Sequence, residues 1–259
     1  PMKKLLPIIL SLAFVVLLNN SIYSQGWIIE ESNNSITYIG DGWVKALPDD
    51  MDEIPMTSMY NPGSNLIIII NENDMTYAKG SPDDYCNTVK AMMSEMNKQM
   101  PAEQKKMMDE MIAQEKAKPS PKVSVEKSSG GSIAGYNTTK YSIKVDGELF
   151  EEKWISNDAS LSGLIQFMNK AIDMTMKTAG CSVPDQVFLR NAPEFSETYK
   201  NVERSGIELK SVSYEYGSEE TGTEVVSLQK EDISSDEFEV PEGYSEVNFG
   251  DLVMSMSGM

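Results

Sequence analysis

Residues 141–155 read YSIKVDGELFEEKWI, and this stretch decides the fold class. In its first half, Tyr141, Ile143 and Val145 alternate with polar residues, which is the two-residue period of a half-buried strand. The pair Asp146-Gly147 that follows is a turn dipeptide of tight hairpins, and strand-forming residues resume after it. The stretch therefore predicts two antiparallel strands joined by a short turn.

The same signature recurs along the chain. Asp41-Gly42 and the polar run 71–74 each separate two short strand-like segments, and Gly130-Gly131 marks another turn. The acidic, proline-marked segment 49–60 predicts a loop. The strands we expect lie within 27–29, 36–39, 43–44, 66–70, 75–77, 123–156, 207–216 and 223–230, with 217–222 joining the last two. Because hairpins dominate, the sheet should be mostly antiparallel, with about eight strands.

Three helices are predicted between these strands. The first begins at Ser81, a good N-cap that is followed by proline, and carries an apolar face as far as Met100. Pro101 separates it from a second helix over 102–117, and a third amphipathic helix covers 158–179. This order indicates an α+β fold: a curved, mostly antiparallel sheet, or half-barrel, with two or three helices on its concave side.

The first 24 residues have the layout of a secretory signal peptide. Two lysines precede an apolar run over 5–18, and a polar stretch ends at Ser24. We expect cleavage after Ser24, a single domain over 25–249 and a loose tail over 250–259. An uncleaved membrane anchor is the alternative, but the run is shorter than the ~20 residues that a spanning helix needs. The mature chain is therefore expected to be exported, periplasmic or extracellular, and not membrane-spanning.

The composition narrows the range of functions. The chain has 40 acidic and 22 basic residues and a net charge of -18, which disfavours a nucleic-acid partner. It has no histidine, which excludes the Ser-His-Asp and Cys-His catalytic systems and the usual imidazole zinc sites. It also lacks a glycine-rich phosphate-binding loop. We therefore expect a protein that is not an enzyme, with no catalytic residues, no cofactor and no metal.

Cys86 and Cys181 are the only cysteines. An even number of cysteines in an exported chain favours one disulfide, which here would join the start of the first helix to the end of the third. Two separately buried thiols are the alternative.

Methionine is concentrated in the first two helices. Seven of the 18 methionines lie close together, namely Met92, Met93, Met96, Met100, Met107, Met108 and Met111. Methionine side chains are flexible and polarizable, so a methionine face suits varied apolar ligands. We expect these residues to form a mobile lid over an apolar cavity beneath the alternating strands. Ordinary core packing and soft-metal binding by the thioethers are the alternatives.

Two further groups of residues have both a functional and a structural interpretation. The acidic clusters 49–53 and 72–74 carry the oxygen ligands that calcium prefers, but neither has a calcium-loop spacing, so solvated turns are favoured. Trp154 and Tyr136 could stack on a ligand, although core packing is the favoured interpretation of a tryptophan in an alternating strand.

Two motifs resemble those of a known family. Residues 133–141 read IAGYNTTKY and residues 152–156 read EKWIS, which is similar to the central motif of the bacterial domain-of-unknown-function family 4412. Residues 238–244, FEVPEGY, resemble that family's closing motif. The chain departs from the family pattern at 206–209, where it lacks a proline.

The resemblance implies a half-barrel similar to that of periplasmic lipoprotein carriers, and the family has no established activity to carry over. It leads us to expect an exported envelope protein that binds a hydrophobic or lipid-like ligand in the half-barrel. The alternative is a structural or interaction protein of the envelope with a filled core and no ligand.

Overall fold

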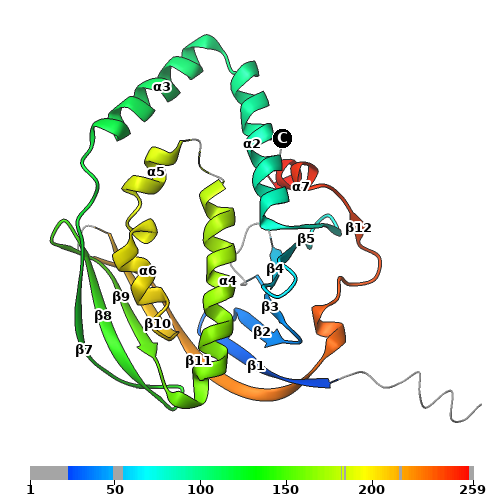
Figure 1. Ribbon diagram of the computed structural model, residues 1–259, viewed down its shortest axis with the longest axis vertical. Coiled ribbons are helices and arrows are strands. Elements are labelled where there is room, and N and C mark those ends of the chain that lie inside the picture. The colour runs from blue at the N-terminus through cyan, green and yellow to red at the C-terminus, as the bar shows by residue number, and fades with distance from the viewer. Residues whose placement is uncertain (1–22, 49–54, 182, 184, 216–217, 257–259) are drawn as a thin grey trace, which may run out of the picture.

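The computed structural model describes residues 23–48, 55–181, 183, 185–215 and 218–256. Across them the chain forms an α+β fold, in which twelve strands make one open sheet and six α-helices pack on it or extend from it (Figure 1). The α+β class and the mostly antiparallel sheet predicted from the sequence are confirmed. The predicted signal peptide lies almost wholly outside the described residues, because the first described strand begins at Tyr23.

The elements have the following bounds. The strands are β1 Tyr23–Glu31, β2 Ile36–Gly40, β3 Trp43–Ala46, β4 Met56–Asn61, β5 Leu66–Asn71, β6 Thr76–Gly80, β7 Val123–Ile133, β8 Tyr136–Val145, β9 Glu148–Ser156, β10 Ile207–Glu215, β11 Ser218–Ser234 and β12 Ser245–Glu246. The α-helices are α2 Pro82–Gln99, α3 Ala102–Ala117, α4 Ser162–Cys181, α5 Gln186–Asn191, α6 Glu197–Glu203 and α7 Phe249–Met256. Short 3-10 helices are η2 Ala159–Leu161, η3 Pro193–Phe195 and η4 Ser235–Phe238.

Strand β11 holds the two parts of the sheet together. The order across the sheet is β12-β6-β5-β4-β3-β2-β1-β11-β10-β9-β8-β7. β11 is 17 residues long and pairs with β1 through one edge and with β10 through the other. Neighbouring strands are antiparallel in each described pairing except that of β12 with β6, which is parallel.

Helix α4 packs across one face of the sheet. Leu164 and Ala171 of α4, with Leu161 just before it, face the sheet at the three- and four-residue steps of one helix face. They are buried against Ile29, Ile39, Val44, Ile207, Leu209, Val225 and Leu228. Full burial of such a side chain contributes about 1.5–3 kcal/mol, so this contact fixes α4 over the middle of the sheet.

Helix α6 covers the neighbouring part of the same sheet. Its Tyr199 and Val202 are buried against Tyr141, Ile143 and Ile155 of β8 and β9. These three side chains belong to the stretch 141–155 that predicted the fold class, and α6 covers them.

Helices α2 and α3, residues 82–117, form what we call the helical arm. In Figure 1, α2 rises from the end of β6 and α3 turns back toward β7, both beyond the edge of the sheet. α3 contains no buried residue. Its start and end at Ala102 and Ala117, and the start of α2 after the N-cap Ser81, agree with the sequence prediction.

The predicted strand count is wrong, since twelve strands are present where about eight were expected from the hairpin pattern. One of the additional strands is β4, which occupies the end of the segment predicted as a loop. Its Thr57 and Met59 side chains are buried, and it pairs with β3 and β5. Because acidic residues precede it, this short alternating stretch was included in the predicted loop.

The predicted turn at Gly130-Gly131 is also wrong. Strand β7 continues through these residues with a shift of register, and the turn falls on Ala134-Gly135. A side chain at Gly130 would lie 2.3 Å from Thr138 Oγ1, so this glycine permits a close cross-strand approach. In the same way β11 begins at Ser218, so most of the predicted link over 217–222 is strand.

Three short helices lie where the sequence predicted none. α5 and α6 lie between residues 179 and 207, where the sequence predicted neither a helix nor a strand. α7 covers the described part of the segment expected to be a loose tail, because Phe249 and Leu252 are buried against Ile67 and Ala78. None of the helices in the described part of the chain has the length and apolarity needed to cross a membrane.

Candidate functional site

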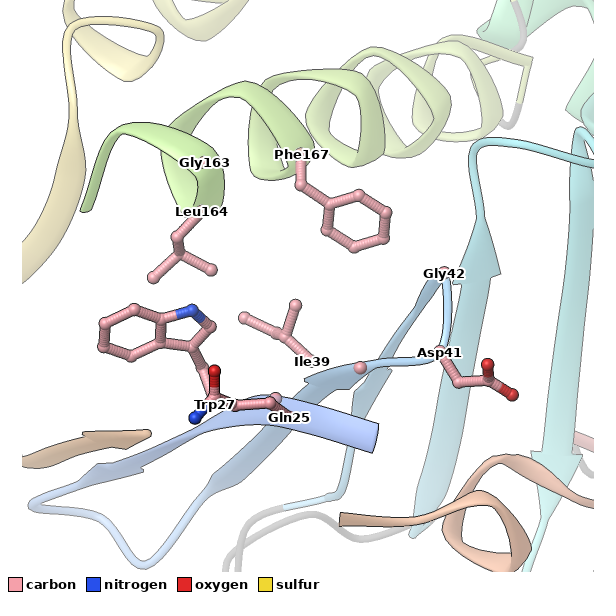
Figure 2. Close-up of a pocket in the computed structure, with 10 residues that line it drawn as sticks. Gln25, Trp27, Ile39, Asp41, Gly42, Gly163, Leu164 and Phe167 are labelled. Atoms are coloured by element: carbon pink, nitrogen blue, oxygen red, sulfur yellow. The ribbon is translucent and has the colours of Figure 1, made fainter. Parts of the chain in front are cut away.

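A pocket of about 220 Å³ lies between the first turns of α4 and the β1–β3 part of the sheet (Figure 2). Figure 2 shows Trp27, Ile39, Leu164 and Phe167 around one space, with Gln25 and Asp41 at its margin. Four glycines complete the lining, namely Gly26, Gly40, Gly42 and Gly163. Four apolar side chains therefore line the pocket together with glycine backbone and the polar Gln25 and Asp41, and the pocket is open to solvent with a lining more polar than apolar.

Glycine at position 163 keeps this pocket open on the helix side. A Cβ atom at Gly163 would have no neighbouring atom within 4 Å, so the first turn of α4 leaves space where a side chain would stand. On the strand side, a Cβ at Gly26 would lie 2.4 Å from the carbonyl oxygen of Ile39. The two strands approach so closely there that only glycine fits.

The start of α4 is fixed by a local cap. Asp158 accepts hydrogen bonds from the backbone N–H and the hydroxyl of Ser160, at 2.9 and 2.6 Å. The Ser160 hydroxyl and then its N–H hold the pKa of Asp158 below its usual range. This cap orients η2 and the helix after it, and so places Leu164 and Phe167 over the sheet.

The arrangement is suited to binding and offers no evident chemistry. By volume alone the pocket has room for one aromatic ring or a short aliphatic chain, since a cavity of about 150 Å³ holds benzene, but unlike that cavity it is open to solvent. Its size is below the 300–1,000 Å³ typical of pockets that bury a drug-sized molecule. A whole lipid would therefore extend out of it.

A second pocket, of about 280 Å³, opens on the other side of α4. Ile29, Met168, Ile172 and Ile207 form its apolar part, and Glu31, Lys153, Glu203 and Glu208 form its charged part. The charged part belongs to what we call the Lys153 cluster: Lys153 and Glu151 of β9, Tyr199 and Glu203 of α6, and Glu208 of β10.

The Lys153 cluster surrounds one buried ammonium with three carboxylates. Lys153 Nζ lies 2.6 Å from Glu203 Oε1, 2.7 Å from Glu208 Oε2 and 3.3 Å from Glu151 Oε1. Lys153 is 6% exposed, and the Tyr199 hydroxyl donates to Glu151 at 2.5 Å. Burial alone would lower the pKa of Lys153, but Glu208 and Glu203 hold it far above its usual range.

The pKa of Glu208 is raised, whereas a salt bridge ordinarily lowers the pKa of a carboxyl group. Burial raises its pKa, Glu203 and Glu151 raise it further, and Lys153 only partly opposes them. Glu208 therefore holds a proton more tightly than an ordinary glutamate does, although its side chain is 34% exposed and solvent moderates the effect.

The structure places the seven predicted lid methionines away from the sheet. None of them is buried, and Met96, Met107 and Met111 are 45%, 58% and 42% exposed. Met93, Met96, Met100 and Met108 line a groove of about 180 Å³ in the angle between α2 and α3. They neither cover a cavity of the sheet nor pack into its core.

The two cysteines meet as predicted from the sequence. Cys86 of α2 and Cys181 at the end of α4 form a disulfide with a Cα–Cα distance of 5.2 Å. The bond sets the base of the helical arm beside the end of α4, where Lys177 and Asp83 also pair at 2.7 Å.

The remaining candidates have structural roles. The first acidic cluster, 49–53, lies outside the described residues, and in the second Glu72 accepts hydrogen bonds from Thr57 and Tyr244. Within the described ranges no group of three or more acidic or cysteine side chains is arranged to hold a metal. Lys140 and Lys210 lie 4.8 and 5.3 Å from the centre of the Trp154 ring, and Tyr136 packs against the core beneath α4.

Sequence reasoning missed both pockets beside α4. Trp27, Ile28 and Ile29 form a continuous apolar run in β1, which indicates a strand but not which of its faces a helix covers. Lys153 shares one face of β9 with Glu151 and Ile155, so the two-residue period places a lysine and a glutamate on the same inward face as an isoleucine. The partners on α6 and β10 are about fifty residues away in the chain, so no local pattern reveals the cluster.

No protein-family model and no curated protein matches the sequence. The site is therefore interpreted from its own geometry.

Proposed function

We propose that this chain is an exported envelope protein that binds a small hydrophobic group in the pocket between α4 and β1–β3. The observation that carries the proposal is the pocket lined by the apolar side chains of Trp27, Ile39, Leu164 and Phe167, beside which Gly163 leaves open space. The ligand is an aromatic or short aliphatic group, or the end of a longer lipid chain that extends into solvent.

The half-barrel and the family relationship are parts of the same proposal. The two motifs at 133–156 and 238–244 support the relationship to the domain-of-unknown-function family 4412. Helix α4 supports a curled sheet, because it contacts both β4 and β10 although β3, β2, β1 and β11 lie between them. A crystal structure with a flat sheet would contradict the half-barrel.

The pocket is tested by filling it from its own wall. In Gly163→Phe the new ring enters space that no atom occupies, so we expect the fold to persist and the affinity for phenylnaphthylamine, followed by its fluorescence, to fall at least about tenfold. Gly163→Ala is the matched control, since a methyl group leaves most of the pocket free. Equal binding by both variants would place the ligand elsewhere.

The alternative is a structural or interaction protein of the envelope without a ligand. Delipidated wild-type protein that binds no apolar probe would establish that alternative. Native mass spectrometry of protein purified from its own host identifies a ligand if one co-purifies.

A further inference from the structure

We propose that the Lys153 cluster is a proton-sensitive latch that fastens α6 to the sheet. The cluster holds α6 against the sheet when one of its three carboxyl groups carries a proton, and this contact weakens when all three are ionised.

The charge balance of the cluster motivates this role. One ammonium neutralises one carboxylate, so full ionisation leaves two uncompensated negative charges around a side chain that is 6% exposed. The Glu151 side chain is 10% exposed, whereas those of Glu203 and Glu208 are 22% and 34% exposed and keep partial contact with water. Proton uptake by one carboxyl group is a direct way to remove the repulsion that water does not screen.

The groups that face Glu208 come from each element packed around it. β9 contributes Glu151 and Lys153, α6 contributes Tyr199 and Glu203, and β1 contributes Glu31 through the shared pocket. α4 presents only apolar Met168 and Ile172 to that pocket. Lys153 is the single cation among these residues, so ionised Glu208 meets more negative than positive charge.

Helix α6 is the element that the latch controls. It has seven residues, too few for an isolated helix to be stable, so it depends on its contacts with the sheet. Two of its side chains belong to the cluster: Glu203 pairs with Lys153, and Tyr199 donates to Glu151. Repulsion within the cluster therefore acts directly on the docking of α6.

The direction of the pH effect follows from Glu208. Its pKa is raised in the folded protein, so its contribution to stability is fully present below the unfolded pKa and is lost as pH rises through the folded pKa. The latch therefore loosens as the pH rises from mildly acidic values.

Hydrogen exchange of the α6 amides, corrected for the intrinsic rate, tests the latch. In the wild type we expect the opening constant to increase at least about threefold as the pH rises from about 4 to about 8, and to level off once the raised folded pKa of Glu208 has been passed. Glu208→Gln keeps the shape but cannot ionise, so α6 should stay protected throughout. Glu197→Gln, on the same helix with a side chain 80% exposed, should behave as the wild type.

A wild-type opening constant that does not change with pH, or a Glu208→Gln variant with the wild-type pH dependence, would overturn the proposal. If Glu208→Gln does not fold, carboxyl ¹³C titration of the wild type decides. A glutamate that titrates clearly above the ordinary value of about 4.3 supports the latch, and glutamates that all titrate near that value overturn it.

Discussion

At the scale of single residues, Lys153 is the side chain whose charge the fold most requires. It is the only cation within contact distance of three carboxylates in the described cluster, and it is nearly inaccessible to water. Because its pKa is raised, its contribution is fully present below the unfolded pKa of about 10.4 and is lost only as the pH rises through the higher folded value.

Lys153→Met should therefore be strongly destabilising. It keeps the aliphatic chain but leaves three carboxylates without a counter-ion, and we expect a loss of about 3–5 kcal/mol in the free energy of unfolding at neutral pH. Urea denaturation measures the loss. Without Lys153, the three carboxyl groups bind protons more tightly in the folded state than in the unfolded state. The free energy of unfolding of the variant should therefore increase as the pH falls.

Lys106→Met is the control, since Lys106 on α3 has a side chain 78% exposed and its pair with Glu110 should contribute little. A loss below about 1 kcal/mol for Lys153→Met would show that the cluster is solvated and that its charges do not depend on one another.

At the scale of elements, the helical arm behaves differently from the sheet on which it stands. Its methionines are exposed or half-buried, whereas Met59 of β4 is completely buried. Surface substitutions away from special features usually change stability by less than about 0.5 kcal/mol.

The double variant Met96→Asp, Met108→Asp should therefore fold like the wild type, as judged by circular dichroism and thermal unfolding. Met59→Asp is the matched control and should unfold the protein, because it buries an unpaired carboxylate. Loss of structure in the arm variant would mean that the arm packs into the core.

The disulfide is the second element-scale test. Cys86 and Cys181 are 95 residues apart, so in the chain-entropy model their bond stabilises the fold by about 4 kcal/mol. We expect Cys86→Ser, Cys181→Ser to lose stability of that order in urea, with no further loss on adding a reductant. Labelling of the denatured, non-reduced wild type should find no free thiol, and two labelled thiols would contradict the bond.

The sequence predicts an element well where residues adjacent in the chain determine its conformation. Asp41-Gly42 and Asp146-Gly147 are tight turns in the structure, with positive φ at each residue. Ser81 and Asp84 form the reciprocal cap that begins α2. The sequence could not show that the methionine face of the arm meets no sheet, because the direction in which α2 leaves β6 is set by contacts with α4 and α7.

The two pockets were beyond sequence reasoning for a related reason. Each lies between α4 and strands that are far from it in the chain. An amphipathic pattern identifies the inward face of a helix but not the gaps that remain once that face is packed.

At the scale of the whole molecule, the predicted processing site can be compared with the sheet. Tyr23 and Ser24 pair with Ser234 and Ile233 at the start of β1. Cleavage after Ser24 would remove these two pairs and keep those from Gln25 to Glu31, so we expect the mature sheet to be retained. N-terminal sequencing of exported protein should begin at or within a few residues of Gln25. Recovery of a full-length chain embedded in the membrane would contradict the prediction.

The position of β11 has a consequence for the order in which the chain can fold. Trp27 of β1 pairs with Lys230 of β11, so partners about two hundred residues apart must meet before the centre of the sheet closes. Until residues 218–234 have been synthesised, β1 and β10 each keep an unpaired edge, which is a site for association with other chains. A ribosome-bound chain therefore cannot complete its sheet until nearly all of it has emerged, and a fragment that ends before β11 should aggregate.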